Sequence, residues 1–300
     1  MKIHFTKMHG LGNDFILINC IDEVCPSDPE TFSRRLCHRR FGIGADQLLL
    51  LYPSDKADFK MRILNADGSE VEMCGNGIRC LAKYIWDRNL SDKDILNIET
   101  IAGIIRPEKA GDLVRVDMGQ PIFEPEKIPV NINEKSREQR AESEEQTKAK
   151  INSKLQALCS MLIIDYPLQI ADKEFKITCV SMGNPHAIIV VDDVDSFPVT
   201  YYGPMIEKHS LFPKKTNVEF IEVPASDEIK MRVWERGSGE TMACGTGASA
   251  VAVASNIKGL SNRNVTVHLL GGDLLIEWAV NNHVYMTGSA VEVFEGIITN

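Results

Sequence analysis

The sequence carries Met73-Cys74-Gly75-Asn76-Gly77 in its first half and Ala243-Cys244-Gly245-Thr246-Gly247 in its second half. Both stretches place a cysteine directly before Gly-x-Gly, and an apolar run typical of a helix follows each of them. Glycines let a ligand approach the backbone closely, and a helix that begins there presents unpaired N–H groups. The repeated motif therefore indicates two similar helix starts, each with a thiol beside it.

The match extends well before the two cysteines. Polar residues recur at nearly the same distance from each cysteine. The matched pairs are Asn65 and Glu235 at nine residues before, Gln47 and Asn217 at 27 before, and Asn13 and Asn184 at 61 and 60 before. This correspondence predicts two copies of one domain, which would place two thiols on opposite sides of one cleft. Stereo-inversion at a carbon atom is the foremost reaction that such an arrangement suits.

Composition narrows the class of protein. A chain of 300 residues with 44% hydrophobic and 25% charged residues can form two medium-sized globular domains with buried cores. The net charge of -9, without a lysine and arginine cluster, argues against a nucleic-acid partner. The N-terminus lacks the apolar core of a signal peptide and no stretch is long enough to span a membrane, so we expect a cytoplasmic protein without a membrane partner. In that compartment the eight cysteines are expected to be free thiols, and their spacing predicts no zinc site.

Short β-rich runs dominate the pattern, with one apolar helix following the repeated motif in each half. These helices, at 77–86 and 247–256, are apolar on most sides, which is typical of a buried helix. We therefore expect a mixed α/β fold in which each domain wraps its strands around one central helix. The expected strands are 15–18, 47–51, 59–64, 175–178, 187–191, 218–223 and 229–234, and a further helix is expected at 29–37.

The domain boundaries follow from the internal repeat. We expect a first domain at 1–119 and a second at 120–288, with the last strand, from about 289 to 300, returning to the first domain. The alternating stretch 284–298 is expected to supply one or two closing strands. A segment rich in charged residues and Gln from 131 to 155 is expected to be a solvated helix or a disordered insertion, without a catalytic role.

The two helix starts suit proton transfer next to a carboxylate. A substrate carboxylate could accept hydrogen bonds from the N–H groups of Gly75 and Asn76 on one side and of Gly245 and Thr246 on the other. We expect the helix ends to lower the pKa of both thiols toward neutrality, so that the pair shares one proton. One cysteine would then remove the α-proton while the opposite cysteine delivers a proton to the other face.

Three further residues lie near these motifs. His186 and Glu235 are titratable groups, although residues of either type are more often structural when considered alone. Arg236 could bind a second carboxylate through two hydrogen bonds, with a surface ion pair as the alternative. The remaining cysteines, 20, 25, 37, 80, 159 and 179, are expected to be packing residues.

The motifs taken together resemble those of the diaminopimelate epimerase family. The resemblance covers nearly the whole chain in order, and it rests on 5–15, 39–47, 65–70, 73–79, 182–186, 216–219 and 235–247. It implies two pseudo-symmetric domains, each a barrel-like mixed β-sheet around a central helix, with the site in the cleft between them. It further implies a homodimeric, cofactor-independent isomerase without a metal, which interconverts LL- and meso-2,6-diaminopimelate for lysine and peptidoglycan precursor biosynthesis.

The resemblance also implies a role for each matched residue. Cys74 and Cys244 correspond to the acid and the base, and His186 and Glu235 to residues that tune them and contact the substrate. The substrate-binding residues would be Asn13, Gln47, Asn65, Asn184, Asn217 and Arg236, largely for the distal end, and Gly75, Asn76, Gly245 and Thr246 for the α-carboxylate. The charged insertion departs from the family's pattern.

Other functions stay open at this point. A proline racemase-like enzyme would also have two cysteines in glycine-rich turns, but such enzymes have Cys-Gly-His-Gly where Asn76 stands here. A non-catalytic amino-acid-binding protein would be expected to lack one of the two cysteines. A thiol redox switch would be expected to show Cys-x-x-Cys, which this sequence does not contain.

Overall fold

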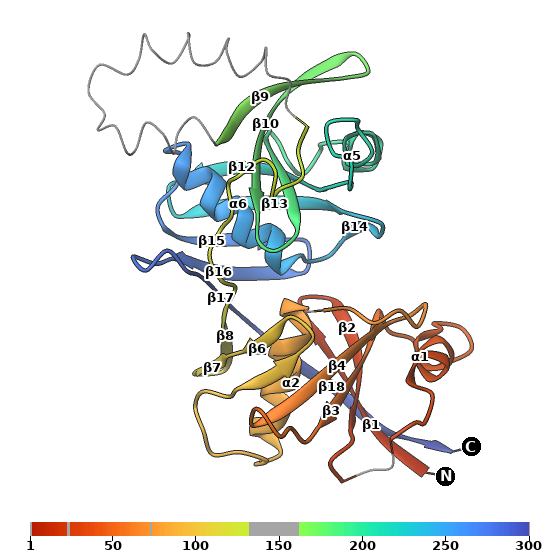
Figure 1. The fold of residues 1–300 in the computed structure, drawn as a ribbon. Coiled ribbons are helices and arrows are strands. Elements are labelled where there is room, and N and C mark those ends of the chain that lie inside the picture. Colours follow the sequence, from red (N-terminus) through yellow and green to blue (C-terminus); the bar gives the residue numbers. More distant parts are fainter. Residues whose placement is uncertain (1, 23–24, 73, 132–161, 300) are drawn as a thin grey trace.

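The computed structural model describes residues 2–22, 25–72, 74–131 and 162–299 and shows two lobes (Figure 1). Both termini lie in the lower lobe, and the chain crosses to the upper lobe and returns. Apart from residue 131, the charged insertion expected at 131–155 lies outside the described residues, as does Cys159.

The lower lobe contains a seven-stranded sheet. The C-terminal strand of the chain lies at one side of this sheet and pairs in antiparallel fashion with the N-terminal strand. The order across the sheet is β18 (Val291–Thr299), β1 (Lys2–Gly10), β2 (Asn13–Asn19), β3 (Gln47–Tyr52), β4 (Phe59–Asn65), β5 (Ile98–Thr100) and β6 (Gly103–Ile105).

An eleven-stranded sheet forms most of the upper lobe and continues into the lower one. Its order is β7 (Pro107–Ala110), β8 (Leu113–Asp117), β17 (Val284–Gly288), β16 (Gly272–Trp278), β15 (Asn264–Leu269), β13 (Glu228–Glu235), β12 (Asn217–Ala225), β11 (Pro185–Val190), β10 (Lys173–Ser181) and β9 (Ile163–Ile170), and β14 (Gly239–Thr241) pairs with β13. The lobes are therefore joined through the β8–β17 pair.

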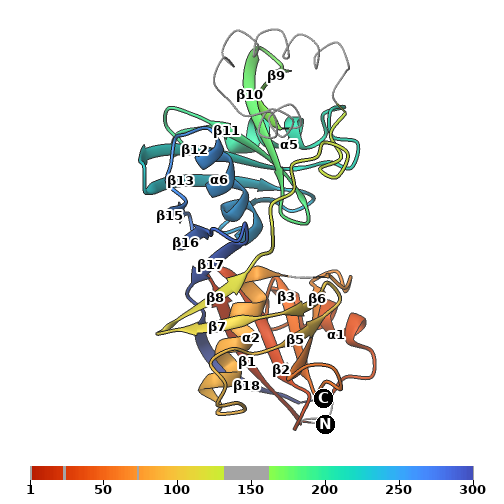
Figure 2. The same cartoon turned by 60° about the vertical axis from the view of Figure 1, so that its left-hand side comes forward.

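Each lobe is built around one buried helix, α2 (Gly75–Asp87) below and α6 (Gly245–Ile257) above. Helix α2 contacts strands β1 to β4, β18 and also β7 and β8, which cross in front of it in Figure 2. Helix α6 contacts β10 to β13 and β15 to β17. Almost every residue of the first two turns of both helices is buried, because strands cover all sides. The expected mixed α/β fold, with two similar domains wrapped around central helices, is confirmed.

Two shorter helices cover the outer faces of the sheets. Helix α1 (Pro29–Cys37) begins where the sequence predicts, because Asp28 caps it by accepting a hydrogen bond from the N–H of Thr31 at 3.1 Å. Helix α5 (Val199–Glu207) was not expected, and it forms despite an internal proline, Pro204. Of the described helices, none is long and apolar enough to cross a membrane.

The structure corrects one expectation about the cysteines. Cys20 and Cys25 form a disulfide in the loop between β2 and α1, with their Cα atoms 5.3 Å apart. The expectation that all cysteines are free thiols is therefore wrong, because a loop this short keeps two thiols within bonding reach. Cys74 and Cys244 are both free thiols.

Candidate active site

The strand register brings three amide side chains of the first lobe together at the same end of three neighbouring strands. Asn13 begins β2, Gln47 begins β3 and Asn65 ends β4. Gln47 lies opposite Phe15 of β2 on one side and opposite Asn65 of β4 on the other, so the three amides lie at this end of the strands. Nε2 of Gln47 donates a hydrogen bond to Oδ1 of Asn65 at 2.8 Å. Residues far apart in sequence thus become neighbours.

The second lobe repeats this arrangement with different residues. His186 of β11 lies opposite Asn217 of β12, Glu235 ends the next strand, β13, and Asn184 immediately precedes β11. Oδ1 of Asn217 accepts a hydrogen bond from the backbone N–H of Arg236 at 2.9 Å. Glu235 therefore ends β13, with Arg236 next in the chain, at the place where Asn65 ends β4 in the first lobe.

Each of the two cysteines occupies the N-cap position of the central helix of its lobe. Sγ of Cys74 accepts a hydrogen bond from the N–H of Gly77 at 3.4 Å, and the thiol donates to Oδ1 of Asn13 at 3.7 Å. Cys244 occupies the N-cap position of α6 without a side-chain capping hydrogen bond, and its Sγ lies 3.5 Å from Oγ1 of Thr246. Both thiols thus lie beside the N–H groups of a first helical turn, which carry the positive end of the helix dipole.

The two helix starts meet where the lobes come together. Asn76 is buried in the first turn of α2, and its Nδ2 donates to the carbonyl oxygen of Ala243, the residue before Cys244, at 3.3 Å. The same nitrogen lies 3.2 Å from Oδ1 of Asn13. A Cβ added to Gly245 would lie 3.9 Å from Oδ1 of Asn76. The first turns of α2 and α6 therefore share one contact region.

The thiol pKa values differ from the sequence expectation. Burial raises the pKa of Cys74, and hydrogen bonds from first-turn N–H groups counteract only part of this rise. Burial raises the pKa of Cys244 well above its usual range, and the negative charges of Glu235 and Glu219 raise it further. The expected lowering toward neutrality is wrong, because the loss of thiolate hydration outweighs the helix-end effect.

Glu219 also lies at this site, although it is not one of the residues expected there from the sequence. Its fully buried Oε1 lies 2.6 Å from Nδ1 of His186, whose Nε2 lies 2.9 Å from Oδ1 of Asn184. Its other oxygen, Oε2, has no hydrogen-bond partner among the described residues. A Cβ added to Gly247 would meet Oε1 at 2.9 Å, so Glu219 lies directly against the first turn of α6. The available signal was its position two residues after Asn217, which places both side chains on one face of β12.

Glu235 and Arg236 differ in exposure. Burial raises the pKa of Glu235, while hydrogen bonds from Thr241 and Cys244 lower it. Arg236 is exposed, and Nη1 of its guanidinium donates to the carbonyl oxygen of Lys214 at 3.3 Å. No ion pair joins Arg236 to a carboxylate in the described part of the chain, so its charge is available to a ligand.

The sequence motifs around these side chains decide the family. The profile of the family described as diaminopimelate epimerase matches residues 5–124 and 178–293. The chain belongs to the diaminopimelate epimerase family. A diaminopimelate epimerase from Moorella thermoacetica is 52% identical to it over 300 residues, with 98% of each chain covered.

Solved structures show how widely the fold of this diaminopimelate epimerase family member is shared. A phenazine biosynthesis protein of the PhzF family from Bacillus anthracis has a TM-score of 0.69 at 17% identity, with 100% of both chains covered. A hydroxyproline epimerase from Agrobacterium vitis has a TM-score of 0.64 at 13% identity, covering 99% of this chain and 92% of that one. Because proteins of different names share the fold, the cysteine site and not the fold carries the functional argument.

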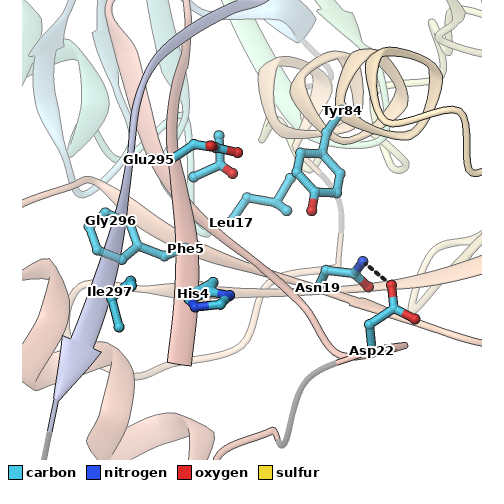
Figure 3. A pocket seen from close by; sticks show the side chains of 10 residues that line it. His4, Phe5, Leu17, Asn19, Asp22, Tyr84, Glu295, Gly296 and Ile297 are labelled. Carbon is cyan, nitrogen blue, oxygen red and sulfur yellow. Dashed lines mark hydrogen bonds between the residues drawn. The ribbon is translucent and has the colours of Figure 1, made fainter. Parts of the chain in front are cut away.

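Other places for a ligand lie apart from the cysteines of this diaminopimelate epimerase family member. A cavity of about 550 Å³ in the lower lobe is bordered by β1, β2, β18 and Tyr84 of α2 (Figure 3). None of the candidate site residues lines this cavity. Within the described ranges, no group of three or more His, Cys, Asp or Glu side chains is arranged to hold a metal ion.

Proposed function

We propose that this chain interconverts LL- and meso-2,6-diaminopimelate without a cofactor, with Cys74 and Cys244 as the two proton-transferring groups. The observation that carries the proposal is the meeting of two helix starts, each with a cysteine at its N-cap position, joined by the hydrogen bond from Asn76 to Ala243. Thiols on two sides of one carbon atom can remove a proton from one face and deliver a proton to the other. As a diaminopimelate epimerase family member, the chain would apply this chemistry to an amino acid.

The substrate's α-carboxylate would lie between the two helix starts. Backbone N–H groups of Gly75 and Asn76 on one side, and of Gly245 and Thr246 on the other, would donate hydrogen bonds to it. These donors are fixed before the reaction begins, so they can stabilise the negative charge that develops when the α-proton leaves. Asn76 is buried and already held at the contact between the lobes, which supports its place in this cradle.

Surrounding charges favour Cys74 as the first base. Burial raises the pKa of both thiols; at Cys74 the negative charge of Glu235 raises the pKa further, and the positive charge of Arg79 lowers it. The carboxylates of Glu235 and Glu219 act in the opposite direction on Cys244. Cys74 would therefore begin one direction of the reaction as thiolate with Cys244 as thiol, and the roles would be exchanged in the other direction.

The remaining polar residues would hold the substrate. Arg236 is exposed and would bind the distal carboxylate, while amide side chains from both lobes would bind the rest of the distal amino acid. These amides are Asn13, Gln47, Asn65, Asn184 and Asn217. His186, held by the carboxylate of Glu219, would keep Asn184 in position, and Glu235 would orient the thiol of Cys244.

The test is an assay of LL-diaminopimelate inversion by chiral chromatography, with reductant and without added cofactor. Cys74→Ala and Cys244→Ala should each lower turnover roughly 10²- to 10⁴-fold, because each removes one proton-transferring group. Cys80→Ala, which changes another buried cysteine on α2, is the matched control and should stay active. A cysteine-to-alanine variant at position 74 or 244 that keeps most of its turnover would rule out the two-base mechanism.

Isotope incorporation tests the assignment of one face to each thiol. In heavy water, product from the first turnovers should carry deuterium at the inverted carbon, and the remaining substrate should carry much less. Equal labelling of both pools from the start would point to a single shared base.

L-Proline should not be racemised under the same conditions, and its racemisation would favour the proline racemase-like alternative.

A homodimer is proposed through the free edge of β18. Among the described strands, this one pairs with β1 on one side and has no partner on the other, and it exposes Val293, Phe294 and Ile297, each by about half of its surface. An open strand edge with apolar side chains is a surface on which a second copy can pair. Phe294→Asp should therefore shift the protein to monomers in analytical ultracentrifugation, whereas Val280→Asp, in an exposed loop of the other lobe, should not. A monomeric wild-type protein would contradict the proposal.

We propose two domains: one comprises residues 1–119 together with 289–300, and the other comprises residues 120–288. Pairing of β18 with β1 supports the return of the chain end to the first domain. We also propose a cytoplasmic location, because two catalytic thiols need a reducing compartment, in which the Cys20–Cys25 disulfide would have to resist reduction. Recovery of the native enzyme outside the cytoplasm after cell fractionation would exclude that location.

A further inference from the structure

Arg79 is a buried cation without a carboxylate partner in the described part of the chain. The residue is 0% exposed, and its hydrogen bonds all go to uncharged acceptors. Nε donates to the carbonyl oxygen of Ser289 at 3.2 Å, Nη1 to that of Gly75 at 3.4 Å, and Nη2 to Oδ1 of Asn76 at 3.0 Å. Nη1 also lies 3.4 Å from Sδ of Met286. No carboxylate pairs with Arg79 among the residues that the structure describes, although a buried charge is costly unless an opposite charge compensates for it.

The contacts of Arg79 join the substrate cradle to the connection between the lobes. Because Arg79 occupies Oδ1 of Asn76, the Nδ2 of that amide is directed toward Asn13 and Ala243. Ser289 lies between β17 and β18, where the chain passes back to the lower lobe. Little free space surrounds the guanidinium, since a Cβ added to Gly288 would lie 3.3 Å from its Nε.

We propose that Arg79 is a positioning residue whose charge balances the substrate's α-carboxylate and whose hydrogen bonds hold Asn76 in the carboxylate cradle. This inference rests on the proposed function, and it explains why an uncompensated cation is kept next to the first turn of α2. The substrate brings a carboxylate, and the thiolate of Cys74 is the other negative charge that Arg79 compensates during the reaction. Arg79 does not touch the substrate, and its effect reaches the carboxylate through Gly75 and Asn76.

The proposal separates ligand affinity from the stability of the free protein. Arg79→Met should change the ligand-free melting temperature little, because the removal of a buried charge without a partner offsets the loss of three hydrogen bonds to uncharged acceptors. The same variant should bind meso-diaminopimelate about tenfold or more weakly by calorimetry, and the ligand should raise its melting temperature less than that of wild type. A merely structural arginine would give the reverse pattern, with a lower melting temperature and an unchanged Kd.

Two further variants complete the experiment. Lys83→Met removes a partly exposed cation from the same helix and should leave Kd unchanged. Arg79→Lys keeps the charge but cannot bridge Asn76 and Ser289 at once, so it should bind more tightly than Arg79→Met and less tightly than wild type. It also provides the test if the methionine variant does not fold. A Kd equal to wild type in Arg79→Met, or in Arg79→Lys if that variant alone folds, would overturn the inference. Because calorimetry needs no turnover, a wild-type protein that binds diaminopimelate without inverting it would refute the proposed function alone.

Discussion

Replacing Glu219 by Gln removes a buried negative charge next to Cys244 and keeps the shape of the side chain. A Cβ added to Gly247 would lie 2.9 Å from Oε1 of Glu219 and 3.3 Å from Sγ of Cys244. The carboxylate oxygen and the sulfur are therefore at most about 6 Å apart. The charge of Glu219 is one reason, after burial and the charge of Glu235, that the pKa of Cys244 is raised. Its removal should make the thiolate easier to form.

Coulomb's law gives the size of this effect. Two unit charges about 6 Å apart interact by about 3 kcal/mol at an effective dielectric constant of 20. Part of this energy is offset by His186, whose Nδ1 is 2.6 Å from the same carboxylate. We expect the thiolate fraction of Cys244 at neutral pH to rise at least about tenfold in Glu219→Gln, which corresponds to about half of the full Coulomb energy. Epimerisation should nevertheless fall, because Gln cannot hold His186 and Asn184 with a charge-assisted hydrogen bond.

The thiolate fraction is measured by the rate of alkylation with iodoacetamide. The experiment uses a Cys74→Ser background, and mass spectrometry of the peptide that contains Cys244 reports its modification. Glu222→Gln is the matched control, because Glu222 is on the same strand but pairs with Lys230 and the N–H of Val194 instead. An unchanged or slower alkylation in Glu219→Gln, with the fold intact by circular dichroism, would refute this reasoning.

Two further predictions concern substrate specificity and acid stability. Arg236→Gln should weaken the binding of diaminopimelate at least about tenfold and the binding of a mono-carboxylate analogue little, because only diaminopimelate offers a distal carboxylate. Equal weakening of both affinities would contradict the proposed role of Arg236. Burial alone would raise the pKa of Asp14, but hydrogen bonds and charges from Arg39 and Lys7 lower it to about 2. This carboxylate therefore contributes stability above about pH 4 that is lost as the pH falls toward 2, and Asp14→Asn should cost about 2 kcal/mol at pH 7. Urea unfolding at several pH values measures this, and an unchanged acid branch in the variant would disprove it.

Much of the fold could be predicted from local patterns. Helix α1 occupies the predicted residues, and the central helices start only two residues earlier than expected, because the first glycine of each motif is already helical. Helix α5 was missed because it contains Pro204 and its formation depends on packing. A Cβ added to Gly203 would meet Trp234 at 2.6 Å, so this helix lies too close to β13 for a larger residue. Such close approach between distant segments leaves no periodic signal in the sequence.

The sequence by itself determined the repeated Cys-Gly-x-Gly motif, the matched amides and, through them, the family. These features depend on residue type and spacing, which the chain carries without folding. Tertiary structure alone decided the electrostatics of the two thiols. Burial reversed the expected direction of their pKa values, and folding brought Arg79 into the field of Cys74 and Glu219 into that of Cys244. The physical reason is that the energy of a charge depends on its hydration and on neighbouring charges in space, and both are set by segments far apart in the sequence.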